Sequence, residues 1–348
     1  MTDAPHDGCG QGLTGRDRMA GWIAVSDGDG PVLPCGPGDF LARGVLVLDI
    51  ALPLLATTVL LDHAGPEGAL SVIYGPGLGC GILHRHGAGL VRYMLPGALA
   101  DGRGTAQMQF CWDTAAGTWS LRFTPASGDG GCAASGTGPM PMPRALLAAA
   151  CMAAQGQSPA LLWFGVTQGA AVCAAPMIGP RTPLATPSGP VAASTLRPGD
   201  MVLTRDDGPL PVLSVLRREM PGRGSFAPVR LRAPFFGAAT DLLLAPDQQI
   251  ALSGVEVEYL FGEDEILVAA RHLVDGTRAL IEDRRAILPW VAIDLGCEAL
   301  LMSGGCALAT APHQPDGPVA SRGLRQIDQF EARTLQAMRR RGATRTAA

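Results

Sequence analysis

The sequence predicts a mainly β protein with two domains, and three features of its composition lead to this fold class. Hydrophobic residues make up 47% of the 348 residues and charged residues only 17%, which favours compact folding over a solvated, disordered chain. This length is sufficient for two domains that each build a core. The 46 glycines and 29 prolines are dispersed along the chain. Such frequent turn residues are typical of many short strands and not of long helices.

The first half of the chain reads as a lead-in followed by a β-sandwich. Residues 1–20 are polar and glycine-rich, and we expect them to be mobile. Beyond them, two stretches that alternate in polarity flank a turn at 113–117. This pattern is typical of a hairpin with one buried and one solvent-exposed face. The spacing is that of jelly-roll and lectin-like domains, a comparison of architecture alone. We expect strands at 45–48, 57–61, 69–73, 81–83, 105–111, 118–124 and 161–167, a loop at 128–138 and a short helix at 143–154.

Two histidines in this half lie two residues apart. His84 and His86 would face the same side of a strand, where they could form a metal-binding pair. No third histidine or carboxylate lies beside them in the sequence. We therefore interpret them as exposed strand histidines.

The last residues differ from the rest of the chain. Over 321–348, apolar residues recur at roughly helical spacing among several arginines. The pattern predicts a helix that docks by one face and ends in a solvated basic tail. Binding of this helix to a membrane surface or to a partner is the alternative.

Composition also bears on partners and location. The net charge of −4 gives no electrostatic reason to expect nucleic acid, and nine scattered cysteines without a CxxC pair indicate neither a disulfide framework nor a zinc site. We expect no cofactor, no bound metal and no integral membrane segment. The first residues lack the apolar core of a signal peptide, so we expect a cytoplasmic protein; export through an uncleaved signal stays open. With these partners set aside, we expect any binding partner to be a protein or a glycan.

The most informative stretch runs from 182 to 206. A short apolar segment precedes a tight turn at Ser188–Gly189, and a second turn at 198–200 leads into a strand over 201–204. This order resembles the opening of Hedgehog/intein (Hint) domains, in which I-x-T-P-x-G is followed by L-x-x-G-D-x-V-L-T. The matching residues are Leu184, Thr186, Pro187, Gly189, Leu196, Gly199, Asp200, Val202, Leu203 and Thr204.

Later segments extend the resemblance over nearly half of the chain. Residues 241–250 (DLLLAPDQQI) are similar to the bacterial pattern D-L-L-V-S-P-x-H-R-V, and 267–276 (LVAARHLVDG) to L-V-P-A-K-H-L-V-N-G. Residues 290–305 resemble the closing strand pair, and 323–333 the tail of the bacterial subfamily. We therefore expect a lead-in at 1–20, a sandwich at 21–172, a Hint-type β-horseshoe at 174–315 and a helix with a basic tail at 321–348.

The resemblance implies autoprocessing chemistry, but the residues that would perform it are replaced. In Hint domains a first Cys or Ser attacks the preceding carbonyl, and a His polarises the scissile peptide. Counting back without a gap places the nucleophile position on Met177, and the His position holds Gln248, which cannot shuttle a proton at neutral pH. Ala292 and Cys297 stand where family members often carry His, and the chain contains no Asn for cyclisation.

One arrangement could restore the chemistry. Cys173 begins a C-x-x-P sequence, the spacing with which these domains often start, and a four-residue insertion would make it the nucleophile. His272 would then have to act as the base, although the family uses that position in its scaffold. The ordinary interpretation of Cys173 is a small buried or linker cysteine.

Three functional hypotheses follow. The first is an inactive Hint domain that serves as a scaffold or interaction module, without turnover of an external substrate. The second is self-cleavage before Cys173 through an N–S acyl shift. The third assigns the function to the sandwich, as an exported carbohydrate-binding or adhesive module.

Overall fold

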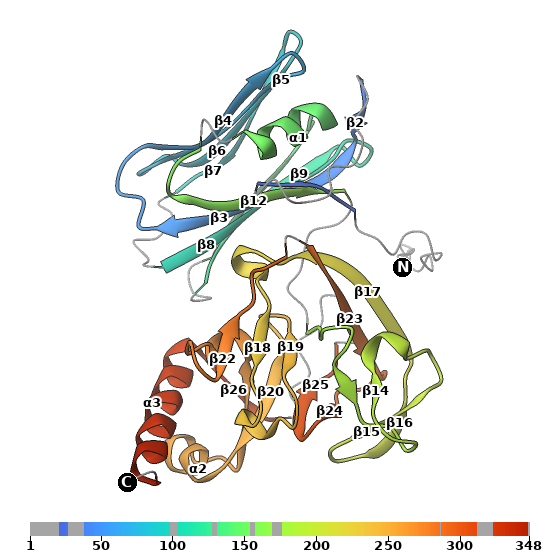
Figure 1. Cartoon of the computed structure of the whole chain (residues 1–348). Helices are drawn as coiled ribbons and strands as arrows, with labels where there is room; N and C mark the ends of the chain where they lie inside the picture. The colour runs from blue at the N-terminus through green and yellow to red at the C-terminus, as the bar shows by residue number, and fades with distance from the viewer. Residues whose placement is uncertain are drawn as a thin grey trace, which may run out of the picture.

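The computed structural model is mainly β and divides by its cores into an N-terminal half, residues 21–168, and a C-terminal half, residues 176–346 (Figure 1). Cys173 and the expected lead-in at 1–20 lie outside the described residues. Within the described ranges, no helix is both long and apolar enough to cross a lipid bilayer. The structure describes residues 21–26, 38–97, 104–126, 131–153, 157–168, 176–285, 287–311 and 323–346.

The N-terminal half is a sandwich of two antiparallel sheets. The larger sheet has the strand order β1-β12-β3-β8-β9-β10, and the smaller is the meander β4-β5-β6-β7. The predicted hairpin is confirmed, since β8 and β9 pair along their lengths with Trp112 opposite Trp119. The strands are β1 (Trp22–Val25), β2 (Phe40–Leu41), β3 (Arg43–Leu52), β4 (Thr58–Gly65), β5 (Gly68–Gly75), β6 (Gly79–His86), β7 (Gly89–Leu95), β8 (Gly104–Asp113), β9 (Thr118–Pro125), β10 (Cys132–Thr137), β11 (Met142–Pro143) and β12 (Leu161–Thr167).

A short helix joins the two sheets of the sandwich. The predicted helix is confirmed as α1 (Arg144–Met152), and it contacts β1 of one sheet and β4 and β5 of the other. Its buried side chains, among them Leu146, Leu147 and Cys151, enter the same core as both sheets. Figure 1 shows α1 packed where the sheets diverge. Because the helix closes that opening, the two sheets share one continuous core.

Two expectations for this half were wrong. The segment 128–138 is not a loop throughout, because β10 (Cys132–Thr137) pairs antiparallel with β9 along its whole length. His84 is not an exposed strand residue, since it is 0% exposed. It follows Cys80 and Ile82 on the face of β6 that points into the core.

The C-terminal half contains several sheets of different sizes. A seven-stranded sheet has the order β16-β15-β24-β25-β20-β21-β26, and shorter sheets pair β13-β14, β17-β23 and β19-β18-β22. The strands are β13 (Pro183–Leu184), β14 (Val191–Ala192), β15 (Met201–Thr204), β16 (Gly208–Pro211), β17 (Ser214–Pro221), β18 (Val229–Leu231), β19 (Leu242–Leu244), β20 (Gln249–Ser253), β21 (Glu265–Ala269), β22 (Ala279–Ile281), β23 (Ile287–Asp294), β24 (Leu300–Ser303), β25 (Cys306–Ala309) and β26 (Arg325–Ile327).

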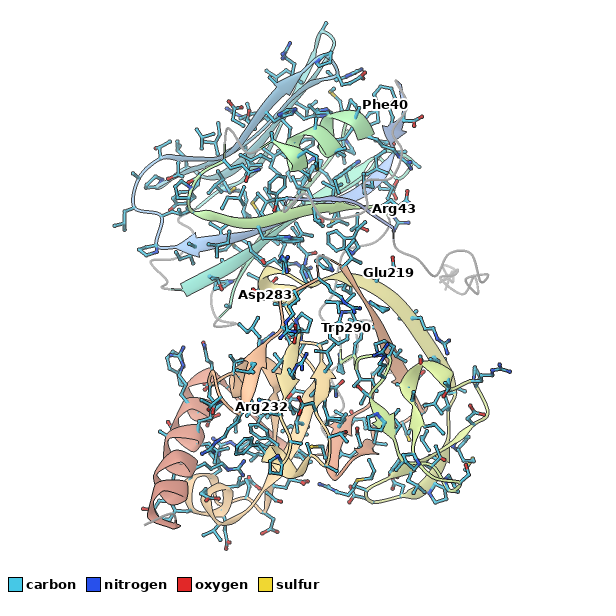
Figure 2. All side chains as sticks on the ribbon, in the orientation of Figure 1. Phe40, Arg43, Glu219, Arg232, Asp283 and Trp290 are labelled. Atoms are coloured by element: carbon cyan, nitrogen blue, oxygen red, sulfur yellow. The ribbon has the colours of Figure 1, made fainter. Side chains whose placement is uncertain are left out.

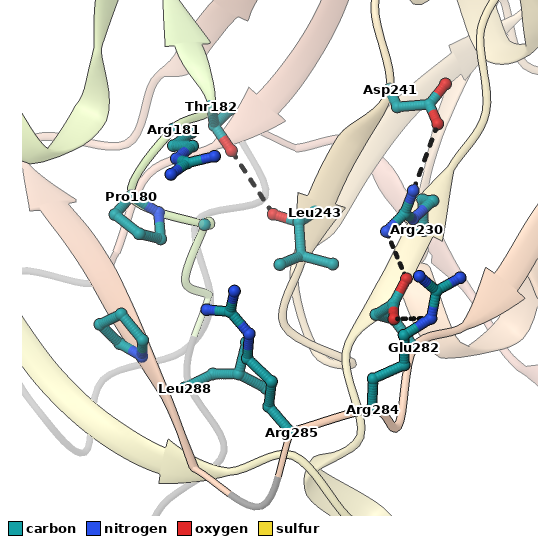
Figure 3. A pocket seen from close by; sticks show the side chains of 12 residues that line it. Pro180, Arg181, Thr182, Arg230, Asp241, Leu243, Glu282, Arg284, Arg285 and Leu288 are labelled. Carbon is teal, nitrogen blue, oxygen red and sulfur yellow. Dashed lines mark hydrogen bonds and ion pairs between the residues drawn. The ribbon is translucent and has the colours of Figure 1, made fainter.

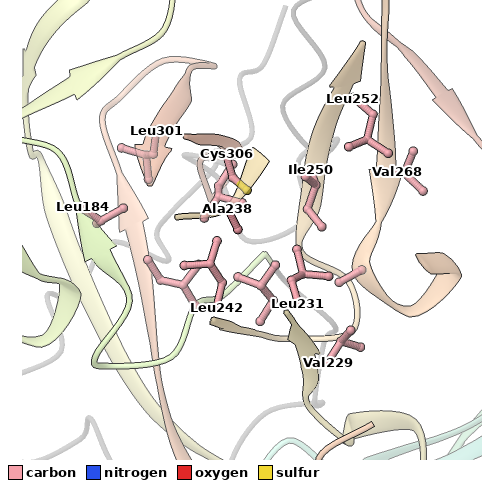
Figure 4. Close-up of a cluster of buried hydrophobic side chains, with 14 of the residues drawn as sticks. Leu184, Val229, Leu231, Ala238, Leu242, Ile250, Leu252, Val268, Leu301 and Cys306 are labelled. Carbon is pink, nitrogen blue, oxygen red and sulfur yellow. The ribbon is translucent and has the colours of Figure 1, made fainter. Parts of the chain in front are cut away.

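One apolar core holds these sheets together. Figure 4 shows side chains from distant parts of the sequence, such as Leu184, Leu242 and Leu301, converging in it. Helix α2 (Val255–Phe261) contributes Val257. The segment after residue 322 belongs to the same core, because β26 pairs in parallel with β21 and α3 (Gln329–Thr346) inserts Leu335.

A third apolar cluster joins the two halves. We call it the interface cluster, and its centre contains aromatic residues from both sides. Figure 2 shows Trp290 and Glu219 at this boundary. The N-terminal half contributes Trp22, Val25, Val45, Val47 and Trp163, and the C-terminal half contributes Met177, Met220, Phe226, Ala245, Leu288, Trp290 and Ala292.

Candidate functional site

The segment that opens the C-terminal half is held between two strands. The Ile178 amide donates to the Val291 carbonyl at 2.9 Å, and the Gly179 amide donates to the Leu243 carbonyl at 2.7 Å. The Ala245 amide donates to the Met177 carbonyl at 2.9 Å. Backbone hydrogen bonds to β19 and β23 therefore fix Met177 beside the 245–248 turn.

Met177 lies in an apolar environment without a base. Its side chain is 5% exposed and belongs to the interface cluster. The cavity beside it measures about 10 Å³, which is room for one water molecule at most. Asp247 is the one titratable residue in its lining, and that carboxylate forms an ion pair with Arg271. The thioether cannot attack a carbonyl and has no ionisable proton, and the Asp247 carboxylate is paired with Arg271.

The side-chain amide of Gln248 donates its hydrogen bonds to the backbone. Its side chain is 1% exposed, and its Nε2 donates to the Gln249 carbonyl at 3.0 Å and to the Ala309 carbonyl at 2.9 Å. Both amide hydrogens thus bond carbonyl oxygens of β20 and β25. An amide in this position ties the two strands together, and it has no proton to exchange at neutral pH.

His272 lies near this region but faces the C-terminal helix. It sits on the 3-10 helix Ala270–Leu273, its Nε2 accepts from Arg271 Nε at 3.2 Å, and its carbonyl accepts from Gln336 of α3 at 2.7 Å. Burial lowers the pKa of its imidazole to about 4, and the nearby Arg271 guanidinium adds to this shift. His272 does not line the Met177 cavity. The structure therefore does not bring this histidine together with the position that a nucleophile would occupy.

The remaining sequence candidates, Ala292 and Cys297, do not line the Met177 cavity. Ala292 is buried in the interface cluster, and Cys297 is exposed on the turn after β23. In the described part of the chain, no group of three or more His, Cys, Asp or Glu side chains is arranged to hold a metal ion.

The N-terminal half closes the candidate site from outside. The Trp22 ring packs edge-on against Trp163, with centroids 5.9 Å apart, and against Phe226 at 6.1 Å. Trp22 Nε1 donates to the Glu219 carbonyl at 3.2 Å, across the boundary between the halves. Phe226 also lines the Met177 cavity. The apolar surface around the candidate nucleophile position is therefore continuous with the surface that binds the sandwich.

A buried carboxylate forms hydrogen bonds across the edge of this contact. Asp49 of β3 is 2% exposed, and it accepts from the Ser225 amide at 2.6 Å and from Ser225 Oγ at 2.9 Å. Burial raises the pKa of Asp49, and the hydrogen bonds from Ser225 oppose that shift. Gln107 of β8 donates to the same hydroxyl at 2.6 Å. This site was not among the residues predicted from the sequence; an acidic residue inside an apolar strand was the signal that could have revealed it.

Comparison with known proteins gives a family match for the C-terminal half. Residues 178–311 match the family model described as Hint domain. No curated protein matches. Among solved structures, the MchDnaB-1 intein is 19% identical, with a TM-score of 0.26, 38% of this chain covered and 98% of the intein. A variant of the same intein gives the same identity and TM-score over 39% of this chain and 99% of its own.

Proposed function

Because this chain contains a Hint domain over residues 178–311, of the Hedgehog/intein superfamily, we propose that the domain is catalytically inactive and serves as a rigid scaffold for the sandwich. One observation carries the proposal. The side chains around Met177, including Ala245 and Trp290, form one apolar cluster with Trp22 and Trp163 of the sandwich. The end of the domain that would hold the scissile bond is used instead as a docking surface within the chain.

The chemistry supports this proposal. An acyl shift requires a nucleophile, a proton carrier and a donor for the developing oxyanion. Met177 supplies no nucleophile, and the Gln248 amide is committed to two backbone carbonyls. General acid–base help alone is typically worth about 10²–10⁴-fold in rate, so losing it together with the nucleophile leaves no useful reaction.

The intact mass of the purified full chain tests the proposal. We expect the 35.9 kDa species to remain unchanged after overnight incubation with hydroxylamine or with a thiol. Met177→Cys is expected to remain intact as well, because the cavity lining offers no free base. Two fragments of similar mass from the unmodified chain would contradict the proposal.

Self-cleavage at Cys173 is the second candidate. The C-x-x-P spacing from Cys173 to Pro176 favours it, since Hint domains often begin in this way. In this reaction the Cys173 thiolate attacks the Val172 carbonyl, a thioester replaces the peptide bond, and the freed α-amine of Cys173 takes up a proton. Hydroxylamine or an added thiol then cleaves the thioester and separates the two fragments. Fragments that disappear in Cys173→Ala, while they persist in Cys297→Ala, would establish it in place of the scaffold.

A glycan-binding function of the sandwich is the third candidate, and a cleft between the halves that polar side chains line in part favours it. The cleft has a volume of about 500 Å³, and Gln107, Gln109 and Arg122 of the sandwich line it together with Arg271. A glycan array probed with the full chain tests this function. Binding that is lost in Arg122→Ala would support it, and signals at background level would remove it.

A further inference from the structure

A second hollow in the Hint domain is lined by an unusual number of arginines. Its volume is about 510 Å³, and it lies between the opening segment at 179–182, strands β18 and β19, and the 282–289 segment (Figure 3). Four guanidinium groups line it, those of Arg181, Arg230, Arg284 and Arg285. Met177 and Gln248 do not line it, so it is distinct from the candidate autoprocessing site.

Two carboxylates neutralise one side of this pocket. Arg230 forms ion pairs with Glu282 and, at 3.7 Å, with Asp241. Arg284 Nε lies 3.0 Å from Glu282 Oε1. Figure 3 shows this network grouped on one side of Leu243. Asp241 and Glu282 therefore balance two of the four positive charges in the lining.

Arg181 and Arg285 supply the excess charge. Among the described residues, no carboxylate lies within ion-pair distance of either guanidinium, and Asp283 of the same loop does not line the pocket. Arg285 extends toward the side of the pocket where Arg181 lies, on the side of Leu243 away from the ion-pair network (Figure 3). The pocket thus holds two unpaired guanidinium groups, although the whole chain has a net charge of −4.

We propose that this pocket binds a small organic phosphate monoester. A guanidinium donates two parallel hydrogen bonds to one oxyanion, which we call a fork. One such fork already uses both oxygens of a carboxylate. A phosphate monoester presents three oxygens and carries a charge of about −1.5 to −2 at pH 7, so it can engage two forks at once. Arg181 and Arg285 come from different segments and match this requirement in number and in charge.

The rest of the lining fits the organic part of such a ligand. Pro180, Leu243, Leu288 and Pro289 provide an apolar surface beside the two unpaired arginines. A pocket that combines apolar walls with a few convergent charged groups is typical of small-molecule sites. Inorganic phosphate would use only the charged part, so a monoester with an apolar group is expected to bind more tightly.

Calorimetry with three probes tests this proposal on the full chain at low ionic strength. We expect phenyl phosphate to bind best, inorganic phosphate at least threefold more weakly, and phenyl sulfate, which has the same shape but one charge, at least tenfold more weakly. Below pH 6 the affinity for phenyl phosphate is expected to fall, because the ligand loses its second charge. Equal affinity for the sulfate and the phosphate would overturn the choice of phosphate.

Two variants locate the binding. Arg181→Gln and Arg285→Gln are each expected to lower the affinity for phenyl phosphate at least tenfold. Neither guanidinium has an ion-pair partner among the described residues, so both variants are expected to keep the unfolding temperature of the unmodified chain. Arg333→Gln, an exposed position on α3, is the control for loss of one charge and should leave the affinity unchanged. Absence of phenyl phosphate binding, or equal weakening in all three variants, would refute the site.

Discussion

His84 is a polar side chain enclosed in the apolar core of the sandwich. It is 0% exposed, and neither of its ring nitrogens has a hydrogen-bond partner among the described residues. Burial lowers the pKa of the imidazole to about 4, and the neighbouring His86 adds to the shift. A buried imidazolium without a partner is costly, so the folded state holds His84 in its neutral form.

The stability of the protein should therefore depend on pH through His84. Its folded pKa is depressed below 6.5, so its contribution is fully present above pH 6.5 and is lost as the pH falls toward 4. From the difference between 6.5 and about 4, we expect a loss that approaches about 3 kcal/mol. Urea unfolding of the unmodified chain and of His84→Leu, from pH 7 to pH 4, measures this contribution as the difference between the two curves.

Other groups titrate in the same range, so the comparison between variants is essential. The pKa of His272 is also lowered to about 4 and adds to the loss in both proteins. The pKa of Asp49 is raised by burial, which favours the folded state as the pH falls and partly offsets the loss. A pH profile of His84→Leu that is parallel to that of the unmodified chain would show that His84 is not the group responsible.

For single residues, the sequence identifies the side chain but not the environment that surrounds it in the fold. His84 has the same strand face as Cys80 and Ile82, which the alternation could have revealed, but the adjacent Arg85 and His86 suggest a wet strand. Met177 and Gln248 could be identified only from the family pattern. That the Gln248 amide bonds the Ala309 carbonyl depends on β25, which lies 61 residues further along the chain. Local sequence carries no information on such a contact.

The segment after β17 is the element that anchors the Hint domain to the sandwich. It contains a 3-10 turn at Gly224–Phe226, which places Ser225 against Asp49 and Phe226 against Trp22. A Cβ on Gly224 would lie 1.9 Å from Asp49 Oδ2, so the close approach of this turn to the carboxylate requires glycine there. The turn thus combines a polar and an apolar contact within a few residues.

Removal of the Ser225 hydroxyl should weaken this anchor. In Ser225→Ala, Asp49 loses one of its hydrogen bonds and Gln107 loses an acceptor, while the carboxylate stays buried. We expect the free energy of unfolding to fall by about 0.5–1.5 kcal/mol, the net contribution of one hydrogen bond, because Asp49 keeps the bond from the Ser225 amide. Equilibrium denaturation in urea measures this change.

Ser194→Ala provides the matched control. Ser194 is exposed, and its backbone carbonyl accepts a hydrogen bond from Arg217 at 3.0 Å, so loss of its hydroxyl should change the stability by less than about 0.5 kcal/mol. Equal effects of the two substitutions would show that the Asp49 contact does not contribute to stability.

Elements with a strong pattern were predictable, whereas elements that depend on a neighbour were not. The β8–β9 hairpin follows from alternation around one turn. Strand β10 is short and contains small residues, so it carries little hydrophobic signal of its own. Gly136 leaves room for the Trp119 indole, since a Cβ there would lie 2.7 Å from that ring. Strand β10 forms because it pairs with the free edge of β9 and packs on the Trp119 ring.

The interface cluster connects the two cores of the whole molecule. Trp22 is 4% exposed and contacts Trp163, Phe226 and the Glu219 carbonyl. Apolar burial of this kind contributes roughly 25 cal/mol per Å², and a buried tryptophan is among the largest single contributors. We therefore expect the sandwich and the Hint domain to unfold together.

Trp22→Ala should separate the two transitions. The substitution removes the central ring of the interface cluster, at an expected cost of about 3–5 kcal/mol. Differential scanning calorimetry should show one transition for the unmodified chain and two for the variant, because each half keeps its own core.

Trp119→Ala is the comparison for this experiment. Its ring packs on Tyr93 and Phe110 inside the sandwich, away from the Hint domain. The variant should melt at a lower temperature but still in one transition. If the unmodified chain already melts in two steps, the halves are independent and the interface cluster does not couple them.

The contact between the halves could not be predicted from the sequence. Trp22, Val45 and Val47 fit equally well as ordinary core residues of a sandwich, and Ala245 and Ala292 read only as losses from a catalytic site. Their shared role appears when both surfaces are seen together. Small residues on one side leave space for large rings on the other, which is a property of the pair and not of either segment.

The strand pairing of β26 has a practical consequence for any shortened form of this protein. The matched family segment ends at residue 311, yet β26 pairs in parallel with β21 and α3 adds Ala332 and Leu335 to the core. A fragment that stops at 311 would leave the backbone groups of β21 open on that side, beside an uncovered apolar surface. An open sheet edge of this kind pairs readily with other chains. Such a fragment would be prone to aggregate, so a boundary placed at the end of the family match would fall inside the unit that folds.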